Sequence, residues 1–250
     1  SIKISEKRAK NQIVNGVKVT PVSKKVKAIP VSIITHSSNN KLIEREGYYK
    51  VDEDFSYGVE LKEIDFKYFN AEEYIFHNLN LKIPKNKHTI ITGPNGSGKS
   101  TLLGLIAKVF YPTEGYININ STEVGYVGVT PLIINGTLRE NLLYGNSRNI
   151  SDIEITKLTQ EFELFNNNEK NLETIIDSKS LSSGQMQKIS FIRSLLSEAK
   201  ILLLDESTSN LDIDTKNLIF NVLKEKNITI INSTHNKEDF EYDHHIKISY

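Results

Sequence analysis

The feature of this chain that most constrains its fold is the stretch at residues 93–101, whose sequence is GPNGSGKST. It fits the pattern G-x-x-x-x-G-K-S/T, in which a glycine-rich loop joins a strand to a helix and its amides surround phosphate oxygens. Residues 88–92 before it form a β-branched run that predicts a buried strand. Residues 102–110 after it are mostly apolar and predict a buried helix. The motif therefore has the strand–loop–helix context that it requires.

The residue types in this loop can each be explained by the chemistry of phosphate binding. Glycine has no Cβ, so successive amide groups can turn inward, and the following helix adds a partial positive charge at its N-terminus. Lys99 would reach the β- and γ-phosphates of a nucleotide, and the Ser100 hydroxyl would be a ligand of Mg²⁺. A plain glycine-rich turn is the alternative. The predicted nucleotide-contacting residues are Gly93, Pro94, Asn95, Gly96, Ser97, Gly98, Lys99, Ser100 and Thr101.

Composition narrows the classes of protein further. A chain of 250 residues can hold one sizeable α/β domain with an appendage, and 38% hydrophobic and 25% charged residues are ordinary for a soluble globular protein. The formal net charge is zero, so the overall charge carries no specific signal for nucleic acid. The lack of cysteine excludes a disulfide scaffold, and no apolar run is long enough to cross a bilayer. We therefore expect the chain by itself to be soluble.

Positive charge is concentrated at the N-terminus. Residues 1–30 carry a group of basic side chains against Glu6 alone; the basic residues are Lys3, Lys7, Arg8, Lys10, Lys18, Lys24, Lys25 and Lys27. Two interpretations are open: a solvated, partly disordered arm, or a segment that lies near an anionic membrane face or a nucleic acid. Residues 37–54 are polar and predict a linker, so we expect ordered structure to begin near Tyr57.

Two stretches before the phosphate loop alternate between apolar and polar residues. They are residues 59–66 and residues 74–83. A period of two is typical of half-buried strands, so we expect a small antiparallel side sheet.

A second group of candidate residues lies in the C-terminal half. Residues 181–185, LSSGQ, precede a helical pattern, and serines at that place cap a helix and leave amide groups for a ligand. Residues 201–206, ILLLDE, predict a central strand that ends in two carboxylates. Asp205 would then hold Mg²⁺, and Glu206 could orient or deprotonate an attacking water. The alternatives are a plain helix cap and a strand that ends in solvated acids.

A third buried strand is predicted at residues 228–232, and His235 follows it closely. A single histidine is most often structural or solvated. At a strand end next to the one bearing Glu206, it could instead sense a γ-phosphate.

The order of these motifs resembles that of an ATP-binding cassette (ABC) nucleotide-binding domain, over roughly residues 57–248. Residues 181–185 resemble the signature motif L-S-G-G-Q, with Ser183 in place of the first glycine. Asp205 and Glu206 resemble the Walker B aspartate and the catalytic glutamate. The other implied assignments are the D-loop at residues 207–212, the switch histidine at His235 and an adenine-stacking aromatic at Tyr68. The resemblance implies that Glu206 and His235 are catalytic and that Ser100 and Asp205 bind the metal. Outside the phosphate loop, the implied nucleotide-contacting residues are Tyr68, Ser182, Ser183, Gly184, Gln185 and Asp212.

The resemblance also implies a fold, a division into domains and a subfamily. The fold is a P-loop NTPase core of the α/β class, with a small antiparallel β subdomain and a helical subdomain at about residues 130–184. Residues 1–56 would be a basic arm, similar to a juxtamembrane connector, and residues 57–250 the nucleotide-binding domain. Residues 135–145, NGTLRENLLYG, resemble the S-G-T-I-R-E-N-I-x-x-G stretch of exporter-type members.

The function implied by the resemblance is that of the ATP-hydrolysing motor of a membrane exporter. Two such domains would meet head to tail, with ATP and Mg²⁺ held on Lys99, Ser100 and Asp205 of one and closed by Ser182 and Gly184 of the other. A homodimer would be competent because one chain carries both halves. The transmembrane domains would be fused upstream or be separate subunits, which places the chain at the cytoplasmic face of a membrane.

One residue departs from the family pattern. The glutamine that helps to ligate Mg²⁺ and couples the ATPase to the membrane domain should fall near Val129. Two other functions therefore stay open: a soluble ABC ATPase that acts on nucleic acid or ribosomes, and a regulatory cassette that binds ATP with little turnover.

Overall fold

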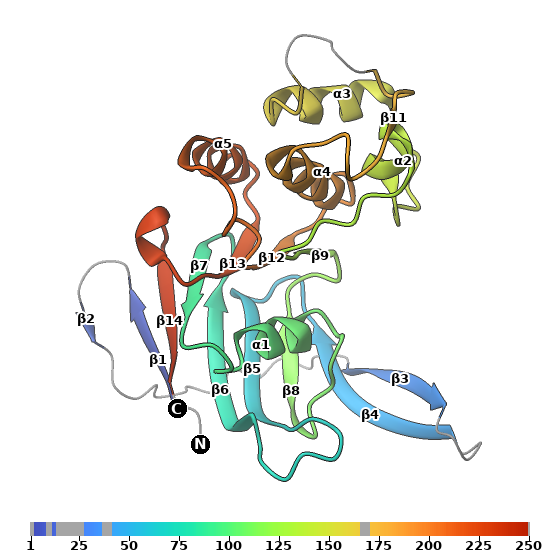
Figure 1. Ribbon diagram of the computed structural model, residues 1–250. Helices are drawn as coiled ribbons and strands as arrows, with labels where there is room; N and C mark the ends of the chain where they lie inside the picture. The colour runs from blue at the N-terminus through green and yellow to red at the C-terminus, as the bar shows by residue number, and fades with distance from the viewer. Residues whose placement is uncertain (1–2, 9–11, 14–27, 37–41, 166–170, 250) are drawn as a thin grey trace. The chain divides into compact units, whose positions relative to one another are not determined.

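The computed structural model describes residues 3–8, 12–13, 28–36, 42–165 and 171–249. The chain divides into two compact units, each with its own architecture (Figure 1). The first unit consists of Ser1–Thr122 and His235–Tyr250, and the second is Glu123–Thr234.

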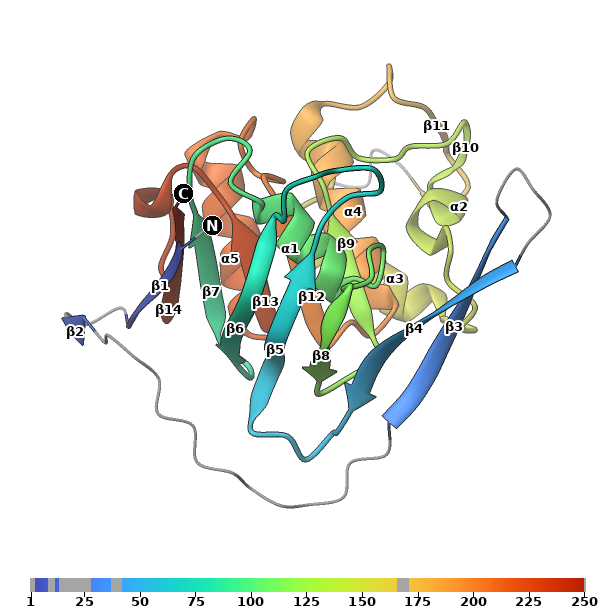
Figure 2. The same cartoon turned by 90° about the horizontal axis from the view of Figure 1, so that it is seen from below.

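Strands of the first unit form two groups. One follows the order β2, β1, β14 and β7, with β1 antiparallel to β14 and β14 parallel to β7. The other is a five-stranded sheet in the order β3, β4, β8, β5 and β6, in which only β4 and β8 are parallel (Figure 2). The strand bounds are β1 Lys3–Arg8, β2 Gln12–Ile13, β3 Ala28–His36, β4 Leu42–Val51, β5 Tyr57–Phe66, β6 Phe76–Pro84, β7 His88–Thr92, β8 Glu114–Ile119 and β14 His244–Ser249. The short 3₁₀ helix η1, Lys237–Asp239, precedes β14.

The predicted side sheet is confirmed, because β5 and β6 pair antiparallel over the two alternating stretches. Their inward residues, such as Leu61, Ile64 and Ile83, are almost fully buried. Strand β8 pairs with the other edge of β5, so the sheet is larger than the two strands that alternation predicts.

The expectation that ordered structure begins near Tyr57 is wrong. Strand β4 occupies most of the predicted linker, and its residues 48–51 pair in parallel with residues 116–119 of β8. The Tyr49 side chain is 1% exposed, and its hydroxyl lies 2.5 Å from the Leu105 carbonyl oxygen and 3.0 Å from that of Phe110. The polar sequence of β4 does not predict a strand, because the burial of β4 depends on contacts with segments far along the chain.

Three segments of the predicted N-terminal arm form strands, namely β1, β2 and the first residues of β3, and the rest of residues 1–30 lies outside the described residues. The division of the chain at residue 56 stays a prediction.

Helix α1, Lys99–Ile106, follows β7 and is buried along most of its length. It starts three residues earlier than predicted and ends four residues earlier. It ends where the amides of Val109 and Phe110 both turn back to the Gly104 carbonyl. A Cβ at Gly104 would lie 2.5 Å from the Phe110 ring, so a glycine lets this ring close the end of the helix.

In its described residues, the second unit contains a parallel sheet in the order β13, β12 and β9, with four helices and a two-stranded ribbon. Its core joins β12 to α4 through side chains such as Leu202, Leu204 and Phe191, and Phe191 stacks on Phe162. The bounds are β9 Val124–Val127, β10 Gly136–Thr137, α2 Leu138–Leu143, α3 Asp152–Glu161, β11 Ile175–Ile176, α4 Ser183–Leu196, β12 Ile201–Asp205, α5 Ile213–Lys224 and β13 Thr229–Ser233.

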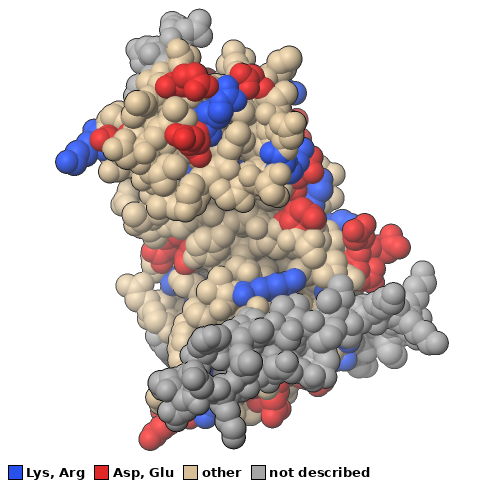
Figure 3. Space-filling view, turned by 90° about the vertical axis from the view of Figure 1, so that its right-hand side faces the viewer, with Lys and Arg blue, Asp and Glu red and all other residues tan. Residues whose placement is uncertain are grey.

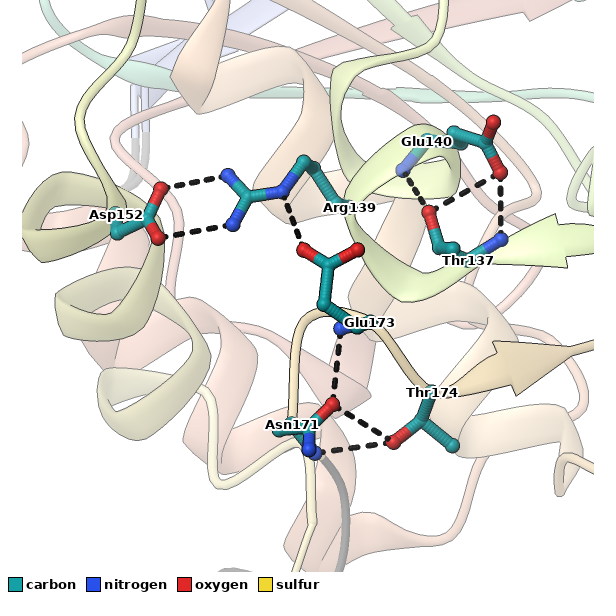
Figure 4. A network of polar contacts seen from close by, with 7 residues as sticks. All are labelled: Thr137, Arg139, Glu140, Asp152, Asn171, Glu173 and Thr174. Atoms are coloured by element: carbon teal, nitrogen blue, oxygen red, sulfur yellow. Dashed lines mark hydrogen bonds and ion pairs between the residues drawn. The ribbon is translucent and has the colours of Figure 1, made fainter.

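An arginine clamp holds α2, α3 and residues 171–174 together within the second unit (Figure 4). The Arg139 guanidinium donates two hydrogen bonds to Asp152 and one to Glu173, at 2.6 to 2.9 Å. These carboxylates raise the pKa of Arg139, and the guanidinium lowers that of Asp152. The arginine of the exporter-like stretch therefore has a defined role in packing this unit.

On the face drawn in Figure 3, acidic and basic side chains lie near one another. In the described part of the chain, every helix is too short or too polar to span a bilayer.

Replacing Tyr49 with phenylalanine tests whether β4 belongs to the folded first unit. We expect Tyr49→Phe to lower the free energy of unfolding by about 1 kcal/mol, because the mutant loses a buried hydroxyl hydrogen bond. Urea denaturation followed by circular dichroism measures this change. Tyr111→Phe, on the neighbouring and less buried ring, is the control and should change stability less. Equal stability of Tyr49→Phe and the unsubstituted protein would contradict the assignment.

Candidate functional site

The phosphate loop, residues 93–101, starts directly after β7, and its last three residues are the first three residues of α1. Gly96 and Gly98 have φ angles of 77° and 94°, in the left-handed region that glycine adopts at little cost. Gly98 is the N-cap of α1, and as a glycine it has no side chain that could cap the helix. A Cβ at Gly93 would lie 2.6 Å from the Ile248 carbonyl oxygen, which explains why the loop needs glycine there too.

Lys99 places its charge inside this loop. The side chain is 5% exposed, and Nζ donates hydrogen bonds to the carbonyls of Gly93 and Pro94 at 3.0 and 3.1 Å. The neighbouring Ser97 is buried, and its hydroxyl has no hydrogen-bond partner among the described residues. A buried ammonium held by neutral carbonyls, beside uncapped helix amides, suits an anionic ligand such as a phosphate.

Three further predicted residues lie on or beside the first turn of α1. Ser100 is exposed, whereas Thr101 is buried and lies 2.7 Å from the Tyr68 hydroxyl, measured between the two oxygen atoms. The Tyr68 ring packs edge-on against Phe66 and Phe110 and remains 42% exposed. The aromatic is thereby tied to the helix that follows the phosphate loop. Its stacking on adenine stays a prediction.

In the second unit, two carboxylates stand at the end of β12. Asp205 is its last residue, and Oδ2 accepts a hydrogen bond of 2.8 Å from the Tyr126 hydroxyl. Burial and this carboxylate raise the pKa of Tyr126, so the phenol is protonated near neutral pH and acts as the donor. Glu206 has a φ angle of 51°, and its amide donates to the Ser233 carbonyl at 3.1 Å. A non-glycine residue in this conformation is strained by about 1–2 kcal/mol, and such strain is concentrated at functional sites.

The signature-like residues form the start of α4. Ser182 is the N-cap and shares a capping box with Gln185, in which each side chain accepts from the other residue's amide at 3.1 and 2.9 Å. Ser183 is the first helical residue and is exposed. A Cβ at Gly184 would lie 3.7 Å from the Thr215 side chain, an ordinary van der Waals distance, so the fold does not require a glycine there for lack of room.

The last two predicted residues lie in different settings. Asp212 is the N-cap of α5 and accepts hydrogen bonds from the amide and hydroxyl of Thr215 at 2.8 and 2.9 Å, which lower its pKa. His235 is exposed, follows β13 and belongs to the first unit. A contact of Asp212 with nucleotide and a role of His235 in hydrolysis stay predictions.

Sequence reasoning missed two residues that organise the second unit. Tyr126 contacts Asp205 as described above. Gln187 is buried in α4, and Nε2 donates to the carbonyls of Gly128 and Val129 at 3.0 and 3.2 Å and also to that of Ser207. It therefore ties together the segments that follow β9 and β12. An amide at a buried helical position is a signal that could have found Gln187, whereas Tyr126 carries none because its partner depends on strand register.

Comparison with known proteins decides the family. A family profile described as "ABC transporter" matches residues 76–209, more than half of the chain. The chain belongs to the ABC transporter family. Its matched domain has the P-loop NTPase fold and resembles the ATP-binding domains of export proteins. The resemblance drawn from the motifs is thereby confirmed.

Relatives of this ABC domain include permeases and export proteins. It is 34% identical over 209 residues to the ATP-dependent permease MDL1 of Candida albicans, covering 74% of this chain and 30% of the relative. The lactococcin-A transport/processing ATP-binding protein LcnC of Lactococcus lactis is 34% identical over 207 residues, covering 76% and 29%. A putative export ATP-binding/permease protein, RT0691 of Rickettsia typhi, is 32% identical over 219 residues, covering 80% and 38%. The chain thus spans well under half of these relatives.

Removing the charge of Lys99 tests the phosphate loop. We expect Lys99→Met to weaken ATP affinity by about tenfold or more, because a charge-assisted hydrogen bond contributes about 1.5–3 kcal/mol. Titration with a fluorescent ATP analogue measures this affinity. Lys87→Met, an exposed lysine of the same unit paired with Asp243, is the control and should bind as the unsubstituted protein does. An unchanged affinity of Lys99→Met would contradict the loop assignment.

Proposed function

We propose that this chain is the ATP-hydrolysing motor of a membrane exporter and that it works as a head-to-tail dimer. The observation that carries the proposal is the buried ammonium of Lys99 inside a loop of left-handed glycines, on a chain that also places two carboxylates at the end of β12. The names of the relatives, which are ATP-dependent permeases and export or transport ATP-binding proteins, support it.

Binding of the triphosphate follows from the loop. The uncapped amides at the start of α1 and the Lys99 ammonium supply positive charge where the β- and γ-phosphates carry negative charge. Tyr68, whose hydroxyl is anchored to Thr101, offers the exposed part of its ring to the base. Both contacts would form on the first unit.

The donor set suits Mg²⁺. Ser100 and Asp205 offer a hydroxyl and a carboxylate, which are hard oxygen ligands. In the described part of the chain, no three histidine, cysteine or acidic side chains gather as a metal cluster. Mg²⁺ needs no such cluster, since it commonly takes one or two protein ligands and completes its shell with phosphate oxygens and water. When bound, the ion would neutralise charge on those oxygens.

Glu206 is the proposed base. Its conformation is held by the amide bond to Ser233 and by the strained φ angle, so its side chain leaves β12 in a defined direction. A carboxylate in this position would orient the attacking water and accept its proton. His235 would assist at the γ-phosphate.

Dimerisation would bring the start of α4 to the nucleotide of a second copy. Ser182 and Gln185 cap each other, so the amides of Ser183 and Gly184 belong to a preformed helix N-terminus, at which Ser183 is exposed. A helix N-terminus favours negative charge, and a γ-phosphate is a suitable partner. Since one chain carries both halves, we propose a homodimer.

The membrane-spanning partner is part of the proposal. The matching segment makes up 26% to 38% of the relatives that are described as permeases or export proteins. We propose that transmembrane domains, fused or separate, hold this chain at the cytoplasmic face of a membrane.

Glu206→Gln tests this function directly. We expect the phosphate-release rate to fall by about 10²-fold or more, because a general base contributes 10²–10⁴-fold, while ATP affinity is retained. With hydrolysis blocked, ATP should shift the protein from monomer to dimer in analytical ultracentrifugation.

The control is Glu198→Gln, which changes another glutamate of the second unit that also has a positive φ angle of 55°. It should hydrolyse ATP at the normal rate. Equal turnover in Glu206→Gln and the unsubstituted protein would exclude Glu206 as the base. Very slow turnover in the unsubstituted protein would favour the regulatory cassette.

A further inference from the structure

Tyr126 and Asp205 meet because of the register between two parallel strands. Tyr126 of β9 pairs with Leu203 of β12, and the β12 side chains at 203 and 205 lie on the same face because a strand has a period of two. The tyrosine ring reaches two residues along β12, and its hydroxyl donates to Asp205 Oδ2 at 2.8 Å. Both residues belong to the second unit.

We propose that Tyr126 is a positioning residue for the Mg²⁺ ligand Asp205. This inference rests on the proposed function and assigns a further residue to the same site. A hydrogen bond to one carboxylate oxygen restricts rotation of the group, and therefore sets the direction in which the other oxygen points. Partners of this kind commonly change metal affinity 10–100-fold when they are removed.

The surroundings of Tyr126 suit such a role better than a purely structural one. The side chain remains 47% exposed, so it adds little to the core, yet its hydroxyl is used on the carboxylate. Three residues further along, at the place where the family pattern expects a metal-linked glutamine, the Val129 side chain has no polar atom. Tyr126 therefore supplies a polar contact to the candidate metal ligand from the segment that leads to Val129.

The Val129 segment is itself fixed to the same region. Gln187 Nε2 donates to the Gly128 and Val129 carbonyls and to the Ser207 carbonyl just beyond Asp205. An amide oxygen at this place would face three carbonyl oxygens, so the orientation of the Gln187 amide is set by its partners. The backbone on both sides of the Tyr126–Asp205 contact is thus held in place, which keeps that contact in register.

The test measures metal binding, separately from turnover. Mn²⁺ replaces Mg²⁺, and electron paramagnetic resonance measures its affinity for the full chain in the presence of a non-hydrolysable ATP analogue. We expect Tyr126→Phe to weaken Mn²⁺ binding by about tenfold. Affinity for the analogue without metal, and the melting temperature, should stay close to those of the unsubstituted protein, because the ring is kept.

Tyr144→Phe is the matched control, since Tyr144 belongs to the same unit and is also 47% exposed. It should bind Mn²⁺ normally. In an Asp205→Asn background, adding Tyr126→Phe should cause no further loss, because the group that Tyr126 positions is already altered.

The outcomes separate the two proposals. If the unsubstituted protein binds Mn²⁺ with the analogue and Tyr126→Phe binds it equally or more tightly, the positioning role is wrong and the proposed function stands. An equal additional loss in the Asp205→Asn background would also overturn the role. If the unsubstituted protein binds neither the analogue nor Mn²⁺, the proposed function itself fails.

Discussion

Parallel pairing of β9, β12 and β13 is the constraint on which the second unit depends. The carboxyl ends of parallel strands meet at one edge of a sheet, so residues far apart in sequence are brought together there. Asp205 and Glu206 follow β12 at this edge, and the amide of Glu206 is bonded to Ser233 at the end of β13. The buried leucines of β12 make this arrangement stable, because they pack on α4 and α5 and leave only the strand end polar. The position of the two carboxylates at this edge is therefore a consequence of the burial of the apolar part of β12.

In the first unit, the main constraint is that the Lys99 ammonium is held inside a backbone loop. Left-handed glycines turn the chain around Lys99, and the crowding at Gly93 and Gly104 shows how closely neighbouring segments approach the loop and its helix. Tyr49 and Tyr68 then fasten distant strands to α1 and its first turn through hydroxyl contacts. The Lys99 ammonium is thus held in place by two backbone carbonyls before a ligand binds, and a preorganised charge can act on a ligand with little reorganisation.

Local signals in the sequence were enough to predict the phosphate loop, the alternating strands β5 and β6, and the acid-ended strand β12. Each depends on a run of residues whose spacing or type is decisive by itself. Tyr49 and Tyr126 could not be found in this way, because each acts on a partner more than fifty residues away. Strand β4 was missed for the same reason: its pairing with β8 is a tertiary contact, and its own sequence is polar. The capping box of Ser182 and Gln185 is local, and it explains physically why the signature-like residues begin a helix.

The central proposal is that the phosphate loop binds ATP and that the carboxylates at the end of β12 take part in its hydrolysis. Hydrogen–deuterium exchange of the full chain, with and without ATP and Mg²⁺, tests it most directly. In one titration, we predict slower exchange at residues 93–101 of the first unit and at residues 205–208 of the second, with the same midpoint in ATP concentration. Protection of the phosphate loop with unchanged exchange at residues 205–208, at saturating ATP and Mg²⁺, would contradict the account.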